Sequence, residues 1–147
     1  MMIVSLRNLA RALFALALTT AGCSKDAPPP AAPAKLELLA LQLRTLDNVN
    51  DGRSVRVLVR RVEPKQFAND GYDSIVALAE HPDGSVLADQ LLRPRSSIQL
   101  RLPLEVGVDV GVYFLFSRPA ADSWKVLLPG DIGEATVVAQ TNVAYSL

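Results

Sequence analysis

The residue types that most often carry chemistry are scarce in this chain of 147 residues, which holds one cysteine, Cys23, and one histidine, His81. A cysteine can act as a nucleophile, a metal ligand or the acceptor of a covalent group. His81 stands beside a Pro-Asp-Gly turn, where a polar side chain normally lies at the surface. No serine lies in a Gly-x-Ser-x-Gly elbow, and no glycine-rich phosphate loop is present. We therefore expect a protein that is not an enzyme and uses neither a metal nor a cofactor.

The chain begins with the pattern of a secretory signal peptide. Arg7 and Arg11 form a short positive start, and residues 12–20 are an apolar run that ends in small residues before Cys23. That run is much shorter than the roughly 20 residues of a membrane-spanning helix. We predict a signal peptide over residues 1–22.

The four residues Thr20, Ala21, Gly22 and Cys23 resemble the bacterial lipobox, in which cleavage falls directly before the cysteine. The resemblance implies a diacylglyceryl group and an N-acyl chain on Cys23, the only covalent group that we expect. Two buried chains suffice for stable anchoring, at about 0.8 kcal/mol per buried CH₂. Ser24 in the next position implies, by the same resemblance, the outer membrane and its periplasmic leaflet. The alternatives are an unmodified thiol or a soluble protein cut between Ala21 and Gly22.

The segment after the cysteine is rich in proline and alanine. Such a sequence favours extended polyproline II, in which the 12 residues 24–35 reach roughly 35 Å. We predict lipid attachment and a tether over 23–35 and one domain over 36–147. Without Arg7 and Arg11, 13 basic residues face 15 acidic ones, a net charge of −2. That balance gives no reason to expect nucleic acid as a partner.

Apolar residues alternate with polar ones in several segments, which is typical of half-buried strands. The segments are 38–44, 54–62, 97–104, 106–116, 123–129 and 135–147. Six or more such strands predict an antiparallel β-sandwich. Trp124 alternates in phase with Val126 and Leu128, which favours a place in the core over a role as an interface anchor. Gly107 and Gly111 alternate with valines and make their strand face a second candidate for a close contact with a partner.

Residues 63–92 lack this alternation. Asp73 or Ser74 can cap a short helix that runs through Ala79, because a side-chain oxygen there accepts an orphan amide. The turn at 81–84 follows. The alternative is a hairpin between residues 74–80 and 86–92.

A basic run precedes this region, with no acidic residue between positions 52 and 62. It consists of Arg53, Arg56, Arg60, Arg61 and Lys65. We interpret it as a solvated strand face that discourages edge-to-edge pairing. Anionic headgroups or an acidic partner are the alternative.

The order of these segments resembles the outer-membrane lipoprotein of the type VI secretion system, the TssJ (VasD, SciN) family. The resemblance rests on residues 50–62, 67–78, 86–102 and 113–129. It implies a transthyretin-like β-sandwich with a short helical insertion. It also implies a place on the periplasmic face of the outer membrane and a partner, the periplasmic C-terminal domain of the large inner-membrane protein TssM. No small-molecule substrate is expected.

In that family the loop between the first two strands contacts the large partner, and here that loop is residues 44–54. Its candidate contact residues are Asn48, Asn50, Asp51, Gly52 and Arg53. From the residues alone, Asn-Asp-Gly could equally close a hairpin. Two other functions stay open: a ligand-binding or inhibitor module, and a pilotin-like assembly factor.

Overall fold

The computed structural model describes residues 35–147. The predicted signal peptide, the lipobox, Cys23 and all but the last residue of the predicted tether lie outside the described residues. The first strand, β1, begins at Leu36.

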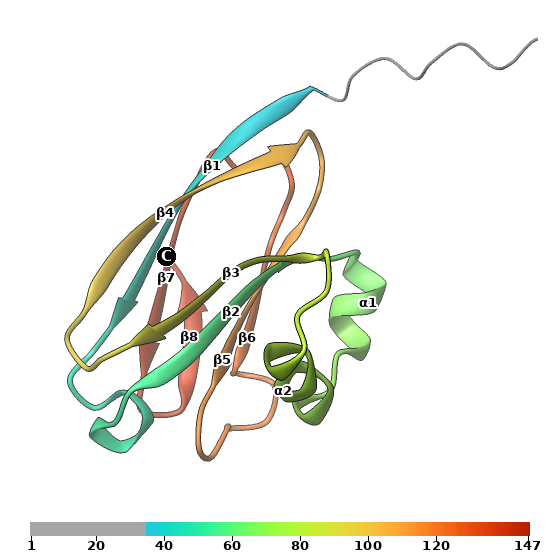
Figure 1. Cartoon of the computed structure of the whole chain (residues 1–147). Helices are drawn as coiled ribbons and strands as arrows, with labels where there is room; N and C mark the ends of the chain where they lie inside the picture. Colours follow the sequence, from blue (N-terminus) through green and yellow to red (C-terminus); the bar gives the residue numbers. More distant parts are fainter. Residues whose placement is uncertain (1–34) are drawn as a thin grey trace, which may run out of the picture. The chain divides into compact units, whose positions relative to one another are not determined.

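Eight strands of the described part form two four-stranded sheets that face each other (Figure 1). The first sheet has the order β4-β1-β7-β8, with β1 (Leu36–Thr45), β4 (Ser97–Glu105), β7 (Glu134–Gln140) and β8 (Val143–Ser146). The second has the order β3-β2-β5-β6, with β2 (Val55–Arg61), β3 (Val86–Leu92), β5 (Val110–Leu115) and β6 (Lys125–Leu128). The predicted β-sandwich is confirmed.

One strand pair departs from the predicted antiparallel arrangement. β1 pairs with β4 in antiparallel register, but its second half, from Ala40 on, pairs with β7 in parallel. A parallel pair needs a long crossover, and here the whole second sheet lies between the two strands in the sequence. Local alternation carries no information on such a pairing.

The core lies between the sheets, where the predicted apolar faces meet. Leu39, Leu41 and Leu43 of β1 are buried, as are the three valines 55, 57 and 59 of β2. Each fully buried side chain of this size contributes about 1.5–3 kcal/mol. This alternation was the correct basis for the prediction, because it brings one face of each strand into the same core.

The outer face of the second sheet is covered by two helices, α1 (Pro64–Asn69) and α2 (Tyr72–Glu80) (Figure 1). The Tyr72 hydroxyl donates to the carbonyl of Phe116 at the end of β5. Beneath the helices, Arg60 is buried and lies 3.7 Å from the carboxylate of Asp70. The interpretation of the basic run as a solvated edge face is therefore wrong at Arg60. β2 is a central strand, and at Arg60 its outer face is covered.

The helical insertion is confirmed, and the alternative hairpin is wrong because residues 72–80 are helical. The predicted cap is also wrong. The helix begins two residues before Ser74, whose hydroxyl instead donates back to the carbonyl of Gly71 at 2.6 Å. A separate first helix, α1, has Pro64 in its first turn, where the missing N–H of proline costs nothing.

Two predicted strands are shorter than their alternation suggested. Residues 106–109 form a turn before β5, with Gly107 at φ +81°. The last segment is a hairpin, because Thr141 at φ 47° ends β7 and reverses the chain. The turn also shifts the phase, so Ala144 is buried while Val143 and Tyr145 are partly exposed.

Trp124 is buried, as predicted, and belongs to the same hydrophobic core as Val126 and Leu128. Its ring packs edge-on against Tyr72 at 5.1 Å and tilts against Tyr113 at 5.8 Å, both on the helical side. Gly111 makes room for the same aromatic cluster, because a Cβ there would lie 2.6 Å from the Tyr113 ring. The strand face that carries Gly111 is thus packed internally and is not a partner surface.

Candidate partner-binding surface

The loop between β1 and β2, residues 46–54, crosses from one sheet to the other (Figure 1). It is therefore not the turn of a two-stranded hairpin. Three consecutive residues, Asn50, Asp51 and Gly52, have φ values of 48°, 56° and 77°. Glycine tolerates this left-handed region because it has no Cβ, and the short polar side chains of asparagine and aspartate offset its steric cost by local hydrogen bonds.

Asn50 holds this loop in place from inside. The residue is 4% exposed, its Oδ1 accepts from the backbone amide of Ser117 at 2.7 Å, and its Nδ2 donates to the carbonyl of Ser54 at 2.7 Å. The amide of Asn50 also donates to the carbonyl of Thr141 at 2.5 Å. The structure therefore places Asn50 within the fold, and its side chain is not presented to a partner.

The other four predicted contact residues, Asn48, Asp51, Gly52 and Arg53, are exposed. The side-chain amide of Asn48 donates to the hydroxyl of Thr141 at 3.0 Å. The guanidinium of Arg53 lies 3.8 Å from the carboxylate of Asp51. The loop thus presents hydrogen-bonding and charged groups of both signs on a backbone that is fixed by Asn50.

A second ion pair extends this surface, and nothing in the sequence indicated it. Arg95, from the turn between β3 and β4, lies 3.1 Å from the carboxylate of Asp47. The hydrogen bond from Arg95, followed by its charge, lowers the pKa of the Asp47 carboxyl. Between this turn and the end of β1 is an open pocket of about 340 Å³, lined by Arg44, Thr45, Leu46, Asp47, Arg95, Ser96 and Ser97. The two partners are 48 residues apart in sequence, so only the fold brings them together.

We call this end of the domain the distal pole: the loop 46–54, the turn 93–96 and the turn 141–142. The opposite end is the N-terminal pole: Lys35 to Leu38, the turn 106–109 and the turn 129–133. Backbone hydrogen bonds connect the N-terminal pole, from the Val106 amide to the Lys35 carbonyl at 3.1 Å and from the Gly107 amide to the Gly130 carbonyl at 3.3 Å. The ten residues of β1 join the two poles (Figure 1).

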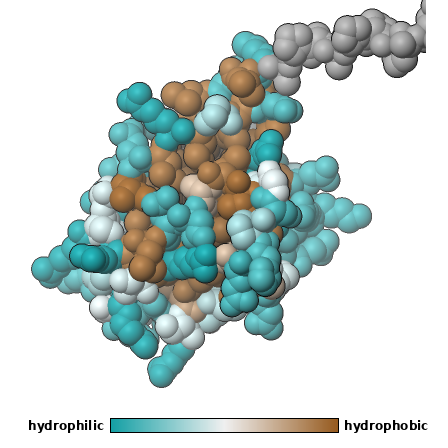
Figure 2. Space-filling view, viewed as in Figure 1, coloured by the Kyte–Doolittle hydropathy of each residue, from teal (hydrophilic) through white to brown (hydrophobic). Residues whose placement is uncertain are grey.

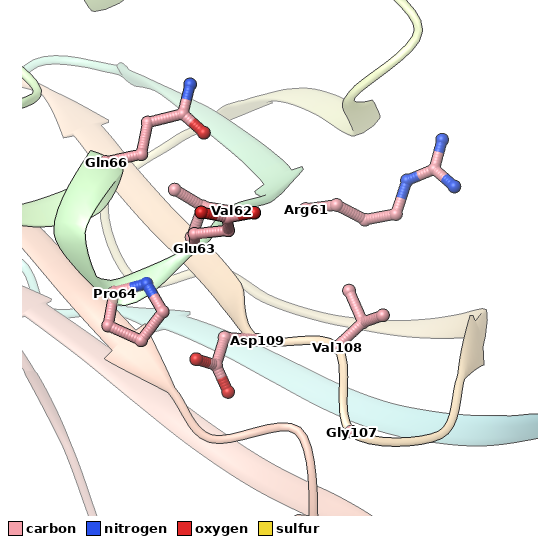
Figure 3. A pocket seen from close by; sticks show the side chains of 8 residues that line it. All are labelled: Arg61, Val62, Glu63, Pro64, Gln66, Gly107, Val108 and Asp109. Carbon is pink, nitrogen blue, oxygen red and sulfur yellow. The ribbon is translucent and has the colours of Figure 1, made fainter.

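A pocket of about 320 Å³ opens beside the N-terminal pole. Figure 3 shows its lining, in which the guanidinium of Arg61 points away from the carboxylates of Glu63 and Asp109. Two of these side chains hold neighbouring loops: Asp109 accepts from the Gly130 amide at 2.8 Å, and Arg61 donates to the Gly84 carbonyl at 2.5 Å. The pocket is thus formed by residues that connect turns.

Within residues 35–147, no three His, Cys, Asp or Glu side chains come together as a metal site. His81 is exposed at the C-terminal end of α2, as expected for a residue beside a turn. No helix in the described part of the chain is long and apolar enough to cross a membrane.

The fold and this surface define a class: a β-sandwich protein with a helical cover on one sheet and a polar loop surface at the pole opposite its N-terminal strand entry. A family model described as the IglE N-terminal domain matches residues 56–139, more than half of the chain. The chain belongs to this family. No curated protein matches the sequence.

Solved structures share the fold. One is the type VI secretion lipoprotein TssJ1 from Pseudomonas aeruginosa, with a TM-score of 0.63 and 12% identity over 77% of this chain and 96% of that chain. A second is described as the TssM C-terminal domain from EAEC, with a TM-score of 0.63 and 21% identity over 76% of this chain and 98% of that chain. A third is described as a type VI membrane complex. It has a TM-score of 0.63 and 21% identity over 77% of this chain and 99% of that chain. The chain therefore has the fold found among type VI secretion lipoproteins.

Proposed function

We propose that this protein is a lipoprotein of the type VI secretion membrane complex, of the TssJ, VasD and SciN kind. It is anchored through Cys23 to the periplasmic face of the outer membrane. Its distal pole binds the periplasmic C-terminal domain of a TssM-like inner-membrane protein. The role is that of a connector between two membranes, without catalysis.

The observation that carries this proposal is the separation of the two poles. The chain enters the domain at Leu36, and β1 ends at Thr45, directly before the loop 46–54. At about 3.3 Å per residue, the strand places the loop about 30 Å from the entry point. A lipid-anchored domain of this design presents its loop on the side away from the attachment of its tether.

The comparisons support the proposal at the level of fold and of the assemblies in which that fold occurs. One similar structure is described as a type VI lipoprotein and another as a type VI membrane complex. The pockets at the two poles, of about 320 and 340 Å³, lie near the lower end of the range for ligand sites, and charged residues line part of both. The exposed polar surface favours a protein partner.

The interface chemistry follows from the exposed residues. Asn48 offers amide hydrogen bonds, while Asp51 and Arg53 offer one charge of each sign. Because their backbone is fixed by the buried Asn50, little loop ordering opposes association, and preorganisation raises affinity. The exposed Asp47–Arg95 pair lies beside them and extends the polar surface.

The test is a titration of the mature chain, made without the lipid by Cys23→Ser, with the periplasmic C-terminal domain of the large partner. The triple change Asn48→Ala, Asp51→Ala and Arg53→Ala leaves the buried Asn50 intact. It should raise Kd at least about tenfold, or 1.4 kcal/mol. The matched control changes Lys35, Glu37 and Asp131 to alanine. These three residues are also exposed, but they lie at the N-terminal pole.

Equal affinity of the triple variant and the wild type would remove the loop from the interface. Absence of binding by the wild-type chain at micromolar concentration would contradict the partner itself. Lipidation is tested separately by mass spectrometry of the mature N-terminus, which should carry the acyl mass on Cys23.

A further inference from the structure

Exposed apolar side chains are concentrated at the N-terminal pole. Six large apolar residues of the described chain are well exposed, and four of them lie at this pole. They are Leu36, Leu38, Val106 and Ile132. Of these four, Leu36 is the most exposed at 63%, and Val106, in the turn after β4, is 52% exposed. Figure 2 shows apolar surface beside the point where the chain enters the domain.

Strand pairing and backbone hydrogen bonds place these residues at the same end of the domain. Leu36 is paired with Glu105 in the sheet, next to Val106. Ile132 lies in the turn whose Gly133 carbonyl accepts from the amide of Ala40. Exposed apolar patches on soluble domains mark contacts with another protein or with a membrane. The position of this patch, at the point where the chain enters the domain, favours contact with a membrane over contact with a protein.

The chain that leads to the proposed lipid enters the domain within this patch. Residues 24–34 connect Cys23 to Lys35, and 11 residues span at most about 40 Å. A connection of this length keeps the pole at high local concentration near the bilayer, so a weak contact is sufficient. No other part of the described domain is as close to the anchor in sequence.

The charges of the pole indicate which lipid surface it tolerates. Within the pole, Lys35 is accompanied by two exposed carboxylates, Glu37 and Asp131, and by the partly buried Asp109. A locally negative surface is repelled by anionic headgroups over about a Debye length. A neutral, zwitterionic lipid surface carries no such penalty.

We propose that the N-terminal pole rests on a zwitterionic phospholipid surface, with Leu36, Leu38, Val106 and Ile132 inserted at the level of the headgroups. This inference depends on the proposed lipidation of Cys23 and goes beyond it, because it fixes the orientation of the domain. With this contact, β1 begins at the bilayer surface and runs away from it. The loop 46–54 then lies about 30 Å farther from the bilayer than the N-terminal pole.

The experiment uses the lipidated chain on phosphatidylcholine vesicles, with and without phosphatidylglycerol. Because acylation removes the only native thiol, a spin label attached to Val106→Cys reports on one position. The control label is at Leu91→Cys, on β3, where the native side chain is 70% exposed. The label at 106 should collide preferentially with oxygen, as in lipid, and the label at 91 with a water-soluble nickel complex. Added phosphatidylglycerol should reduce the contrast.

A second measurement keeps the test independent of the anchor. In the unacylated Cys23→Ser chain, Val106→Asp should lower partitioning into phosphatidylcholine vesicles about tenfold, and Leu91→Asp should leave it unchanged. Equal water exposure of the two labels on a chain with a confirmed acyl mass would overturn the lipid contact and leave the proposed function standing. An unmodified Cys23 would overturn the anchored form on which both depend. If the 106 label becomes buried only when the TssM-like domain is added, the patch is a protein interface and the inference is wrong.

Discussion

The side-chain oxygen of Asn50 accepts a 2.7 Å hydrogen bond from the backbone amide of Ser117, which joins the loop after β1 to the end of β5 across the two sheets. The bond is buried, and it fixes the loop that we propose as the partner surface. Four measurements follow from this relationship and from others like it.

The change Asn50→Ala should lower the free energy of unfolding by about 2 kcal/mol. It leaves the Ser117 amide without its acceptor, and it places an alanine at φ 48°, where a Cβ is unfavourable. Urea denaturation measures the loss. The control Asn48→Ala, at an exposed side chain two residues earlier, should change stability by less than about 0.5 kcal/mol. Equal effects of the two substitutions would contradict the structural role of Asn50.

The change Asp70→Ala should destabilise the domain by about 3 kcal/mol, because it leaves the buried guanidinium of Arg60 without a counter-charge. The Tyr113 hydroxyl also loses its 2.5 Å bond to Asp70. The control Asp89→Ala breaks the Arg56–Asp89 ion pair, which is more exposed than the Arg60–Asp70 pair. It should cost less than about 1 kcal/mol of stability. The comparison is made by thermal unfolding. A larger effect at Asp89 would mean that the helices are not held by the buried pair.

The change Gly111→Ala should cost at least about 1 kcal/mol, since its Cβ would lie 2.6 Å from the buried ring of Tyr113. Gly84 has no atom within 4 Å of an added Cβ and serves as the control. The near-ultraviolet circular dichroism of the aromatic cluster should change only in the first variant. An unchanged spectrum and stability in both would show that the ring moves freely.

Stability should fall as the pH rises above about 10. Burial raises the pKa of Tyr72 and of Tyr113, and the hydrogen bond to Asp70 raises that of Tyr113 further. The unfolded chain ionises these phenols near their ordinary value while the native chain keeps their protons, so ionisation favours unfolding in this range. Phenolate absorbance during an alkaline titration measures the ionisation of the tyrosines.

The control for this titration is Tyr113→Phe. Because Tyr113 stays protonated in the folded protein, the variant and the wild type should show the same number of phenolates until circular dichroism reports unfolding. One additional phenolate in the folded wild type would contradict the shift.

The sequence was a good guide where burial depends on local alternation. Leu41 and Leu43 of β1 and Val57 and Val59 of β2 line the core as predicted, because a strand directs alternate side chains to opposite faces. The rule failed at Arg60, which alternates as an outward residue but is buried under the helices. Alternation identifies two faces and cannot tell whether a distant segment covers the second one.

The candidate surface divides in the same way. The sequence alone located the loop and its turn-forming residues, because Asn50, Asp51 and Gly52 are the types that accept a left-handed backbone. Only the tertiary structure decided which of them face the solvent. Asn50 turns inward to Ser117, and Arg95 arrives beside Asp47 from 48 positions away, because two sheets packed face to face bring their connecting turns together at the same pole.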